Sequence, residues 1–237
     1  MPVYKARETI VQAIQSVLNQ TYQNWELIIV NDCCPDNSCT QVKDIVVSNL
    51  QIFQIDNTNN QGVAISRNKG IAKAKGNVIA FLDSDDYWHP NKLRLQVDKI
   101  RSGYDVVCSN YMRVESNTKT REVFHKSEFD YSDMLKSNQI GNLTGTYRCD
   151  HIGKIYQKNV GHEDYIMWLE IVKIAKKGYC IQTPLAYYRV TNNSLSSNKF
   201  QAAIWQWKVY RKEINLGLIK SIWFFLNYFY AAYKKRQ

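Results

Sequence analysis

The sequence predicts an α/β fold, with an open, mainly parallel sheet flanked by helices and a helical tail at the carboxyl end. Three observations predict it. Apolar strands alternate with amphipathic helices up to residue 82, the pattern of parallel strands joined by crossover helices. Acidic and amide side chains directly follow several of these strands. After about residue 200 the composition becomes aromatic and basic.

The first half of the chain carries the alternation. Apolar residues recur at helical spacing over residues 8–20, and a further helix is predicted over residues 63–75, where Gly76 ends it. Short apolar runs indicate buried strands over residues 25–30, 52–55 and 77–82. In open sheets of this kind ligands bind beyond the carboxyl ends of the strands, so we expect the chemistry in the residues that follow each strand.

The second half is less regular. Its patterns predict a strand over 104–109, a hairpin turn over 115–120 followed by a strand at 122–124, a helix after Asp130, and an amphipathic helix over 162–177 that ends at Gly178. We find no internal repeat and no low-complexity linker.

The net charge and the cysteine pattern limit which classes of protein the chain can belong to. Lys and Arg number 31 against 21 Asp and Glu, a net charge of +10, which indicates anionic partners such as nucleic acid, anionic lipid or phosphorylated substrates. The six cysteines show no spacing typical of a zinc site or a disulfide framework. No signal peptide and no run of ~20 apolar residues is recognisable, so we expect a cytoplasmic protein.

Three carboxylates within four positions form the strongest local signal, in FLDSDDYWHP at residues 81–90. Mg²⁺ and Mn²⁺ prefer oxygen ligands and commonly bind through one or two carboxylates plus substrate phosphates. Asp83 and Asp85 are therefore candidate metal ligands. Taken alone, such a D-x-D stretch is more often a solvated acidic turn at the start of a helix.

Two further residues gain meaning from their position. Asp32 ends the predicted strand at 25–30, although it also suits a simple Asx-turn. Arg67 lies near the start of the helix over 63–75, and both a helix N-terminus and an arginine attract phosphate. A surface arginine is the alternative interpretation.

The order of these motifs resembles the family 2 glycosyltransferases, which have the GT-A fold, and the resemblance implies a Rossmann-like nucleotide-binding half. The matching stretches are MPVY (1–4), SVLNQTYQNWELIIVND (16–32), NQGVAISRNKGIAKAKG (60–76), FLDSDDYWHPNKL (81–93), GHEDYIMWLEI (161–171) and PLAYYRVTNNSLS (184–196). The resemblance implies an inverting enzyme that moves a hexose from a UDP-sugar to an acceptor hydroxyl with the help of Mn²⁺ or Mg²⁺.

The resemblance also implies roles for individual residues. Pro2, Val3 and Tyr4 would border the nucleotide base, Asp32 would bind the uracil or ribose side, Arg67 would approach the diphosphate, Asp83 and Asp85 would form the DxD motif, and Asp164 would act as base beside Glu163. His162 is a lower-ranked candidate base, for which we expect a structural or substrate-contact role. Without the resemblance, Glu163 and Asp164 would be read as an ordinary acidic helix start.

The chain departs from the family pattern in two places. Family members usually carry several further residues of the first strand, so we expect that strand to be truncated or to continue upstream of Met1. A truncated, inactive relative is then an alternative. Family members also often have two aspartates and a Gly-Ser loop where this chain has residues 31–36, so only Asp32 carries over.

We expect two parts in the chain: a GT-A domain over residues 1–199 and an amphipathic tail over 200–237. The tail combines Trp, Tyr and Phe with lysines and arginines and ends in Lys234, Lys235 and Arg236. This composition suits a helix lying on an anionic membrane. A helical pair packed on the domain or on a second subunit is the alternative.

A membrane location at the inner face of the cell membrane would make a polyprenyl-diphosphate-linked saccharide of O-antigen, capsule or exopolysaccharide the acceptor, by analogy with the family. Nucleic acid is not an expected partner, because the basic residues are dispersed and no binding signature is present. A metal-dependent nucleotidyltransferase remains the rival enzyme. The oligomeric state is left open.

Overall fold

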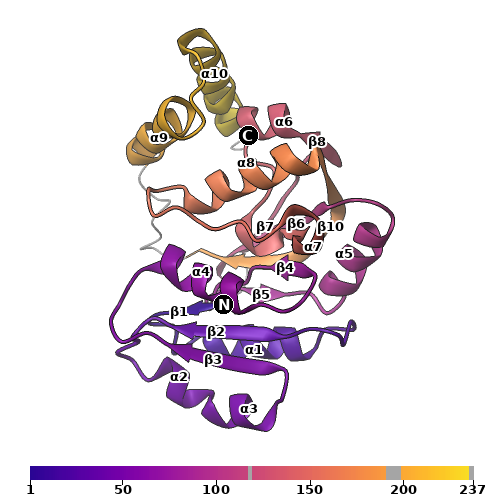
Figure 1. Cartoon of the computed structure of the whole chain (residues 1–237), viewed down its shortest axis with the longest axis vertical. Helices are drawn as coiled ribbons and strands as arrows, with labels where there is room; N and C mark the ends of the chain where they lie inside the picture. Colours follow the sequence, from indigo (N-terminus) through magenta and orange to yellow (C-terminus); the bar gives the residue numbers. More distant parts are fainter. Residues whose placement is uncertain (117–118, 191–198, 235–237) are drawn as a thin grey trace.

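The computed structural model describes residues 1–116, 119–190 and 199–234 (Figure 1). The strands are β1 (Pro2–Val3), β2 (Leu27–Asn31), β3 (Ile52–Asp56), β4 (Val78–Ala80), β5 (Tyr87–Trp88), β6 (Val106–Ser116), β7 (Lys119–Val123), β8 (Glu128–Asp130), β9 (Thr146–Arg148) and β10 (Lys177–Arg189). The helices are α1 (Ile10–Leu18), α2 (Ser38–Gln41), α3 (Lys43–Ser48), α4 (Val63–Lys73), α5 (Lys92–Arg101), α6 (Tyr131–Lys136), η1 (Asn142–Thr144), α7 (Cys149–Ile152), α8 (Glu163–Ala175), α9 (Lys199–Lys208), η3 (Val209–Glu213) and α10 (Leu218–Lys234).

The amino-terminal half forms a parallel sheet in the order β1-β2-β3. Its ladder places the carboxyl end of each strand on the same edge: the Val30 amide donates to the Met1 carbonyl at 2.8 Å and the Asp32 amide to the Val3 carbonyl at 2.9 Å. The amphipathic helix α1 buries Ile10, Ile14 and other apolar residues in the core that this sheet shares. The helices predicted over residues 8–20 and 63–75 and the strands predicted over 25–30 and 52–55 are confirmed.

The larger sheet follows the path β4-β9-β6-β10-β5, with β7 on β6 and β8 on β10. Within it only β6 and β10 run parallel, and the other pairs are antiparallel. The α/β class is confirmed, but a mainly parallel arrangement is right only for the first three strands. The reason lies with β4, which pairs with β9 from far along the chain, and local alternation of helices and strands carries no information about such a partner.

Helix α8 crosses the larger sheet and supplies the centre of its core. Trp168 is fully buried there, with its ring edge-on to Phe81 and to Tyr147 at centroid distances of 5.7 and 6.0 Å. The prediction that Gly178 ends this helix is wrong. The helix ends at Ala175, before Lys176 in the left-handed region, and Gly178 lies in β10, where a Cβ atom would come within 2.4 Å of the Phe129 ring.

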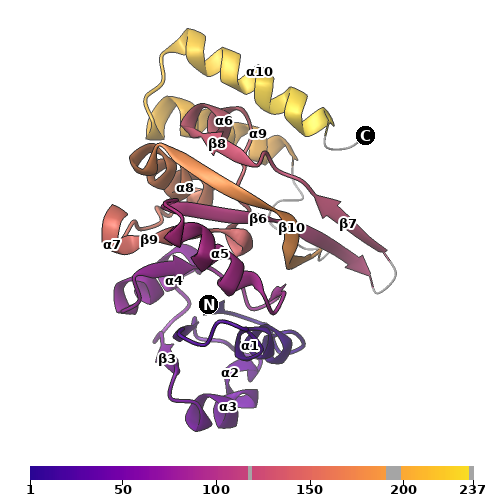
Figure 2. The same ribbon diagram turned by 90° about the vertical axis from the view of Figure 1, so that its right-hand side faces the viewer.

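The tail packs partly on the domain. Val209 and Tyr210 of η3 are buried, and the Tyr210 hydroxyl donates to the Leu135 carbonyl at 2.6 Å. Figure 2 shows α9 and α10 together with α6 and α8, at the end of the molecule furthest from α2 and α3. In the part of the chain that the structure describes, no helix combines the length and apolarity needed to cross a bilayer. Lys235 and Arg236 lie outside the described residues, as do residues 191–198 of the last matching stretch.

Candidate active site

An ion pair lies where the two sheets meet. Arg67 projects from the second turn of α4, and Asp83 lies just beyond β4. Nη2 of Arg67 donates to both carboxylate oxygens of Asp83, at 2.7 and 2.8 Å, while Nη1 donates to the Gln157 side chain at 3.2 Å. The Arg67 side chain is 10% exposed and that of Asp83 is 27% exposed. The pair is therefore largely shielded from water, and the Asp83 carboxylate is the more accessible partner.

The charges around Arg67 come from distant parts of the sequence. Burial by itself lowers the pKa of Arg67, but the charge and hydrogen bonds of Asp83, and then the charges of Asp164 and Glu163, raise it above its usual value. Glu163 and Asp164 form the first turn of α8, and both are half-buried. The structure therefore brings the predicted acid pair of α8 into electrostatic range of the predicted phosphate contact.

The acidic loop after β4 holds two more carboxylates. Burial, and next the charge of Asp83, raise the pKa of Asp85. Burial and the charges of Asp85 and Asp83 raise the pKa of Asp86 to about 9. Neighbouring buried carboxylates repel one another when all of them are ionised. A bound divalent cation would offset this repulsion and stabilise their charged forms.

The fit of this loop to a divalent cation can be judged from its donors. Among residues 1–116, 119–190 and 199–234, no group of three or more His, Cys, Asp or Glu side chains is placed to enclose a metal ion. Asp83 and Asp85 together offer two carboxylates, which matches cations of the Mg²⁺ type that complete their shell with water and substrate phosphates. The residues present therefore fit such an ion.

Asp32, just after β2, binds the loop that precedes α4. It is 3% exposed, and its carboxylate accepts hydrogen bonds from the Gln61 amide at 2.8 Å, the Gly62 amide at 2.9 Å and the Asn57 side chain at 2.8 Å. Burial raises its pKa, but these hydrogen bonds outweigh burial and lower it. Asp32 thus holds the loop that leads into α4 and positions Arg67.

The first strand ends beside Asp32. Val3 is fully buried in the core, whereas Tyr4 is 44% exposed at the carboxyl end of β1. Pro2 pairs with Val30 in the parallel ladder. Any contact of Val3 with a ligand would therefore use its backbone, whereas the Tyr4 ring is partly exposed and has the Lys5 ammonium 5.3 Å from its centre.

His162 is the N-cap residue of α8, and its ring packs against the helices around it. The ring lies edge-on to Trp205 of α9 at 5.4 Å and to Tyr165 at 6.4 Å, and Nε2 is 3.3 Å from the Ala202 carbonyl. Its neighbour Gly161, with φ of 81°, has no room for a side chain, because a Cβ atom would lie 2.8 Å from Trp205. These contacts indicate a structural role for His162, which connects the start of α8 with α9.

The structure adds Arg189, to which sequence reasoning gave no role. Its Nη1 donates to the Asp85 carbonyl at 2.6 Å, its amide donates to the Asp86 carboxylate at 2.9 Å, and its guanidinium lies 4.8 Å from the centre of the Tyr87 ring. The only sequence signal was its place in PLAYYRVTNNSLS. Asp56 ends the edge strand β3, and its carboxylate accepts a hydrogen bond from the Asn31 side chain at 2.8 Å.

Comparisons with known proteins agree on one family. The family model described as "Glycosyl transferase family 2" matches residues 1–156. The chain is 35% identical, over 99% of its length and 95% of the relative's, to the putative teichuronic acid biosynthesis glycosyltransferase TuaG of Bacillus subtilis. It is 34% identical, over 99% and 92%, to the UDP-Glc:alpha-D-GlcNAc-diphosphoundecaprenol beta-1,3-glucosyltransferase WfgD of Escherichia coli.

A solved structure shares the fold. Residues 1–349 of S. aureus TarS, in complex with UDP-GlcNAc, superpose with a TM-score of 0.74 at 17% identity, covering 96% of this chain and 70% of that one. The fold is therefore that of the GT-A glycosyltransferases, as the order of motifs predicted. The matched family model, together with relatives that share a third of their residues over nearly the whole length, means that the chain belongs to glycosyl transferase family 2.

Proposed function

We propose that this glycosyltransferase moves a hexose, with inversion, from a UDP-sugar to a saccharide linked to a polyprenyl diphosphate. The observation that carries the proposal is the position of Arg67, which is bound by Asp83 of the acidic loop after β4 and lies within electrostatic range of the acidic first turn of α8. A site for this reaction needs positive charge for the departing diphosphate and a base for the acceptor. The name of the WfgD relative supplies the acceptor class.

Mn²⁺ or Mg²⁺ is the proposed cofactor, held by Asp85 and Asp83. When bound, such an ion supplies Lewis-acid stabilisation for the negative charge that develops on the leaving diphosphate. Arg67 adds a fixed positive charge beside it, and Asp83 keeps the guanidinium in place through two hydrogen bonds. Arg189 holds the loop that carries Asp85 by bonding to its carbonyl.

Asp164 is the proposed base that removes the proton from the acceptor hydroxyl, with Glu163 beside it. Both stand at the start of α8, half-buried and facing the charge of Arg67. A positioned base of this kind contributes roughly 10²- to 10⁴-fold to the rate. The nucleotide would lie along the carboxyl ends of β1 and β2, bordered by Pro2, Val3 and Tyr4 and by Asp32.

The tail is proposed to rest on an anionic membrane, at its inner face. In α10 exposed apolar residues follow one side of the helix and form a stripe: Leu218, Ile219, Ile222, Trp223, Leu226, Phe229 and Tyr230. Amphipathic helices with aromatic apolar faces and nearby cations bind at the headgroup boundary. Such contact would bring the site to a membrane-linked acceptor.

The test is an assay with UDP-glucose, Mn²⁺ and a synthetic GlcNAc-diphosphate-lipid acceptor. We expect release of UDP together with a disaccharide-diphosphate-lipid carrying a β-linkage. An α-linked product would contradict inversion. Pyrophosphate released from a nucleoside triphosphate in place of UDP would favour the rival nucleotidyltransferase, and the Asp164→Asn variant is the matched control for contaminating activity.

A further inference from the structure

The buried side chain of Gln157 lies beside Arg67, on the segment between α7 and α8. Gln157 is 4% exposed, and its side-chain oxygen accepts a hydrogen bond from Nη1 of Arg67 at 3.2 Å. Within the part of the chain that the structure describes, neither Nε2 of Gln157 nor Nε of Arg67 has a hydrogen-bond partner. A buried N–H group without an acceptor is costly, so these two neighbouring donors call for an acceptor from a ligand.

The orientation of the Gln157 carboxamide follows from its neighbour. Arginine carries N–H donors and no acceptor, so the atom of Gln157 that faces Nη1 of Arg67 must be the carbonyl oxygen. A flipped carboxamide would turn its NH₂ group toward the guanidinium and lose this hydrogen bond. The Nε2 donors therefore point away from Nη1.

The backbone of Gln157 is held from α4. The Gln157 amide donates to the side-chain oxygen of Asn68 at 2.7 Å, and the side-chain nitrogen of Asn68 donates to the Gln157 carbonyl at 2.8 Å. Arg67 and Asn68 are consecutive residues of α4, so one helix fixes both the side chain and the backbone of Gln157. Binding sites use a few polar groups fixed in this way to orient a ligand.

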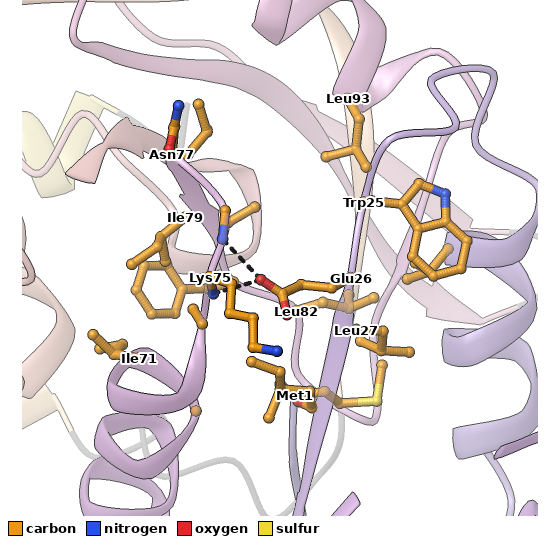
Figure 3. Close-up of a pocket in the computed structure, with 18 of the residues that line it drawn as sticks. Met1, Trp25, Glu26, Leu27, Ile71, Lys75, Asn77, Ile79, Leu82 and Leu93 are labelled. Atoms are coloured by element: carbon orange, nitrogen blue, oxygen red, sulfur yellow. Dashed lines mark hydrogen bonds between the residues drawn. The ribbon is translucent and has the colours of Figure 1, made fainter. Parts of the chain in front are cut away.

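Arg67 also borders an apolar pocket of about 580 Å³ between β2 and β4. Figure 3 shows Met1 on one side of this pocket and Ile71 on the other. Neither Gln157 nor Asp83 lines it. Apolar walls leave the hydroxyl groups of a sugar without hydrogen-bond partners, so the polar neighbours of Arg67, and not this pocket, mark the place of the donor.

The hexose of the donor has to lie between the leaving diphosphate and the base, because inversion requires attack on the sugar carbon from the side opposite to the leaving group. Asp83 binds Nη2 of Arg67, and Gln157 binds Nη1 of the same guanidinium. The segment of Gln157 continues into the first turn of α8, where Asp164 lies within electrostatic range of Arg67. Gln157 thus connects the proposed diphosphate contact to the segment that carries the proposed base.

We propose that Nε2 of Gln157 donates a hydrogen bond to a hydroxyl oxygen of the donor hexose and so takes part in selecting that sugar. The inference rests on the proposed function, because it takes the diphosphate beside Arg67 and the base at Asp164 as given. A buried polar group that binds a hydroxyl discriminates against an analogue lacking it, since the group is then left unpaired. Gln157 is therefore a specificity-determining residue for the donor sugar.

Calorimetric binding of UDP and of UDP-glucose to the full chain, at one Mn²⁺ concentration and without acceptor, tests the inference. Gln157→Met keeps the length of the side chain and removes the donor. We expect the Kd for UDP-glucose, divided by the Kd for UDP, to rise roughly 5-fold or more, because only UDP-glucose carries a hexose. Gln54→Met, at an exposed position of the edge strand β3, is the matched control and should leave this ratio unchanged.

A second variant keeps the test decisive if Gln157→Met folds poorly. Gln157→Glu retains an acceptor for Nη1 of Arg67 and loses the donor, so the same rise in the ratio is expected. If both variants weaken UDP and UDP-glucose binding equally, or weaken neither, the inference is overturned, because Gln157 would then at most support Arg67. A parent protein that binds neither compound would contradict the proposed function itself, and this inference with it.

Discussion

Nη2 of Arg67 donates to both carboxylate oxygens of Asp83, joining helix α4, which follows β3 of the first sheet, to the loop after β4 of the second sheet. The pair fixes a positive charge where the diphosphate of the donor is proposed to lie. The two hydrogen bonds to Asp83 hold the guanidinium in a defined orientation. The carboxylate of Asp83 also neutralises part of its positive charge. The geometry of this pair leads to the first prediction.

Arg67→Lys should lower kcat/KM for the UDP-sugar by roughly 10- to 100-fold, because a lysine cannot reach Asp83 and Gln157 together and a charge-assisted hydrogen bond is lost. Initial rates at several donor concentrations measure the effect. Lys73→Ala, an exposed position on the same helix, should leave the rate unchanged. A fully active Arg67→Lys enzyme would remove the residue from the proposed site.

Asp85→Asn should raise the Mn²⁺ concentration needed for half-maximal activity by roughly 10-fold or more, because one of two proposed carboxylate ligands is lost. The fold should persist, since the contact of this residue with Arg189 uses the backbone carbonyl. A Mn²⁺ titration of the rate provides the measurement, and Asp98→Asn on the exposed surface of α5 is the control. An unchanged titration curve would rule out Asp85 as a ligand.

Asp164→Asn should lower kcat by about 10²- to 10⁴-fold while KM for the donor stays within about twofold, because a base acts only in the chemical step. Glu163→Gln should cost less. His162→Asn separates the two candidate bases, since the ring of His162 is engaged with α9. If His162→Asn abolished turnover and Asp164→Asn did not, the assignment would have to be reversed.

Charge placed on the outer stripe of α10 should release the protein from anionic vesicles. Ile219→Glu together with Leu226→Glu, at positions 85% and 63% exposed, should abolish co-sedimentation with phosphatidylglycerol vesicles and leave turnover of a water-soluble acceptor unaltered. Val47→Glu, which charges an exposed apolar residue of α3 at the other end of the molecule, is the matched control. Unaltered sedimentation of the double variant would disprove the membrane role of the stripe.

Lys92→Met should flatten the dependence of stability on pH. Lys92 is fully buried, its Nζ donates to Gln96 at 2.7 Å, and burial lowers its pKa to about 7. Between this value and 10.5 the unfolded chain binds more protons than the folded one, so stability rises with pH across that window. The difference between these two pKa values corresponds to about 5 kcal/mol. Urea midpoints at pH 6.5 and pH 9 should differ less in the variant than in the parent, whereas Lys73→Met should keep the difference.

The sequence predicted most of the amino-terminal half because its elements are local. The helix at α1 and the strand at β2 depend on the spacing of apolar residues a few positions apart, and both formed where expected. The helix after Asp130 has its own local signal, a capping box between Asp130 and Asp133. Such features need no knowledge of the rest of the chain.

Long-range pairing was the part that sequence patterns did not reveal. Neither the antiparallel partner of β4 nor the contact of Arg189 with Asp85 has a local signature, because each joins segments far apart in sequence. Gly178 was misread for the same reason, since the Phe129 ring that excludes a side chain there comes from another strand. The candidate site residues came from the family resemblance, and the structure brings Arg67, Asp83, Asp85 and Asp164 into one electrostatic neighbourhood.

The close fit of Trp205 against Gly161 has a practical consequence for anyone who shortens this protein. The indole packs against the turn that leads directly into Glu163 and Asp164, so removing residues 200–237 would disturb the position of the proposed base as well as taking away the helix proposed to contact the membrane. With such a deletion, loss of the proposed membrane binding could not be distinguished from loss of the proposed transfer reaction. Single substitutions on the exposed side of α10 test the two roles separately, because they leave the contact of Trp205 with Gly161 unchanged.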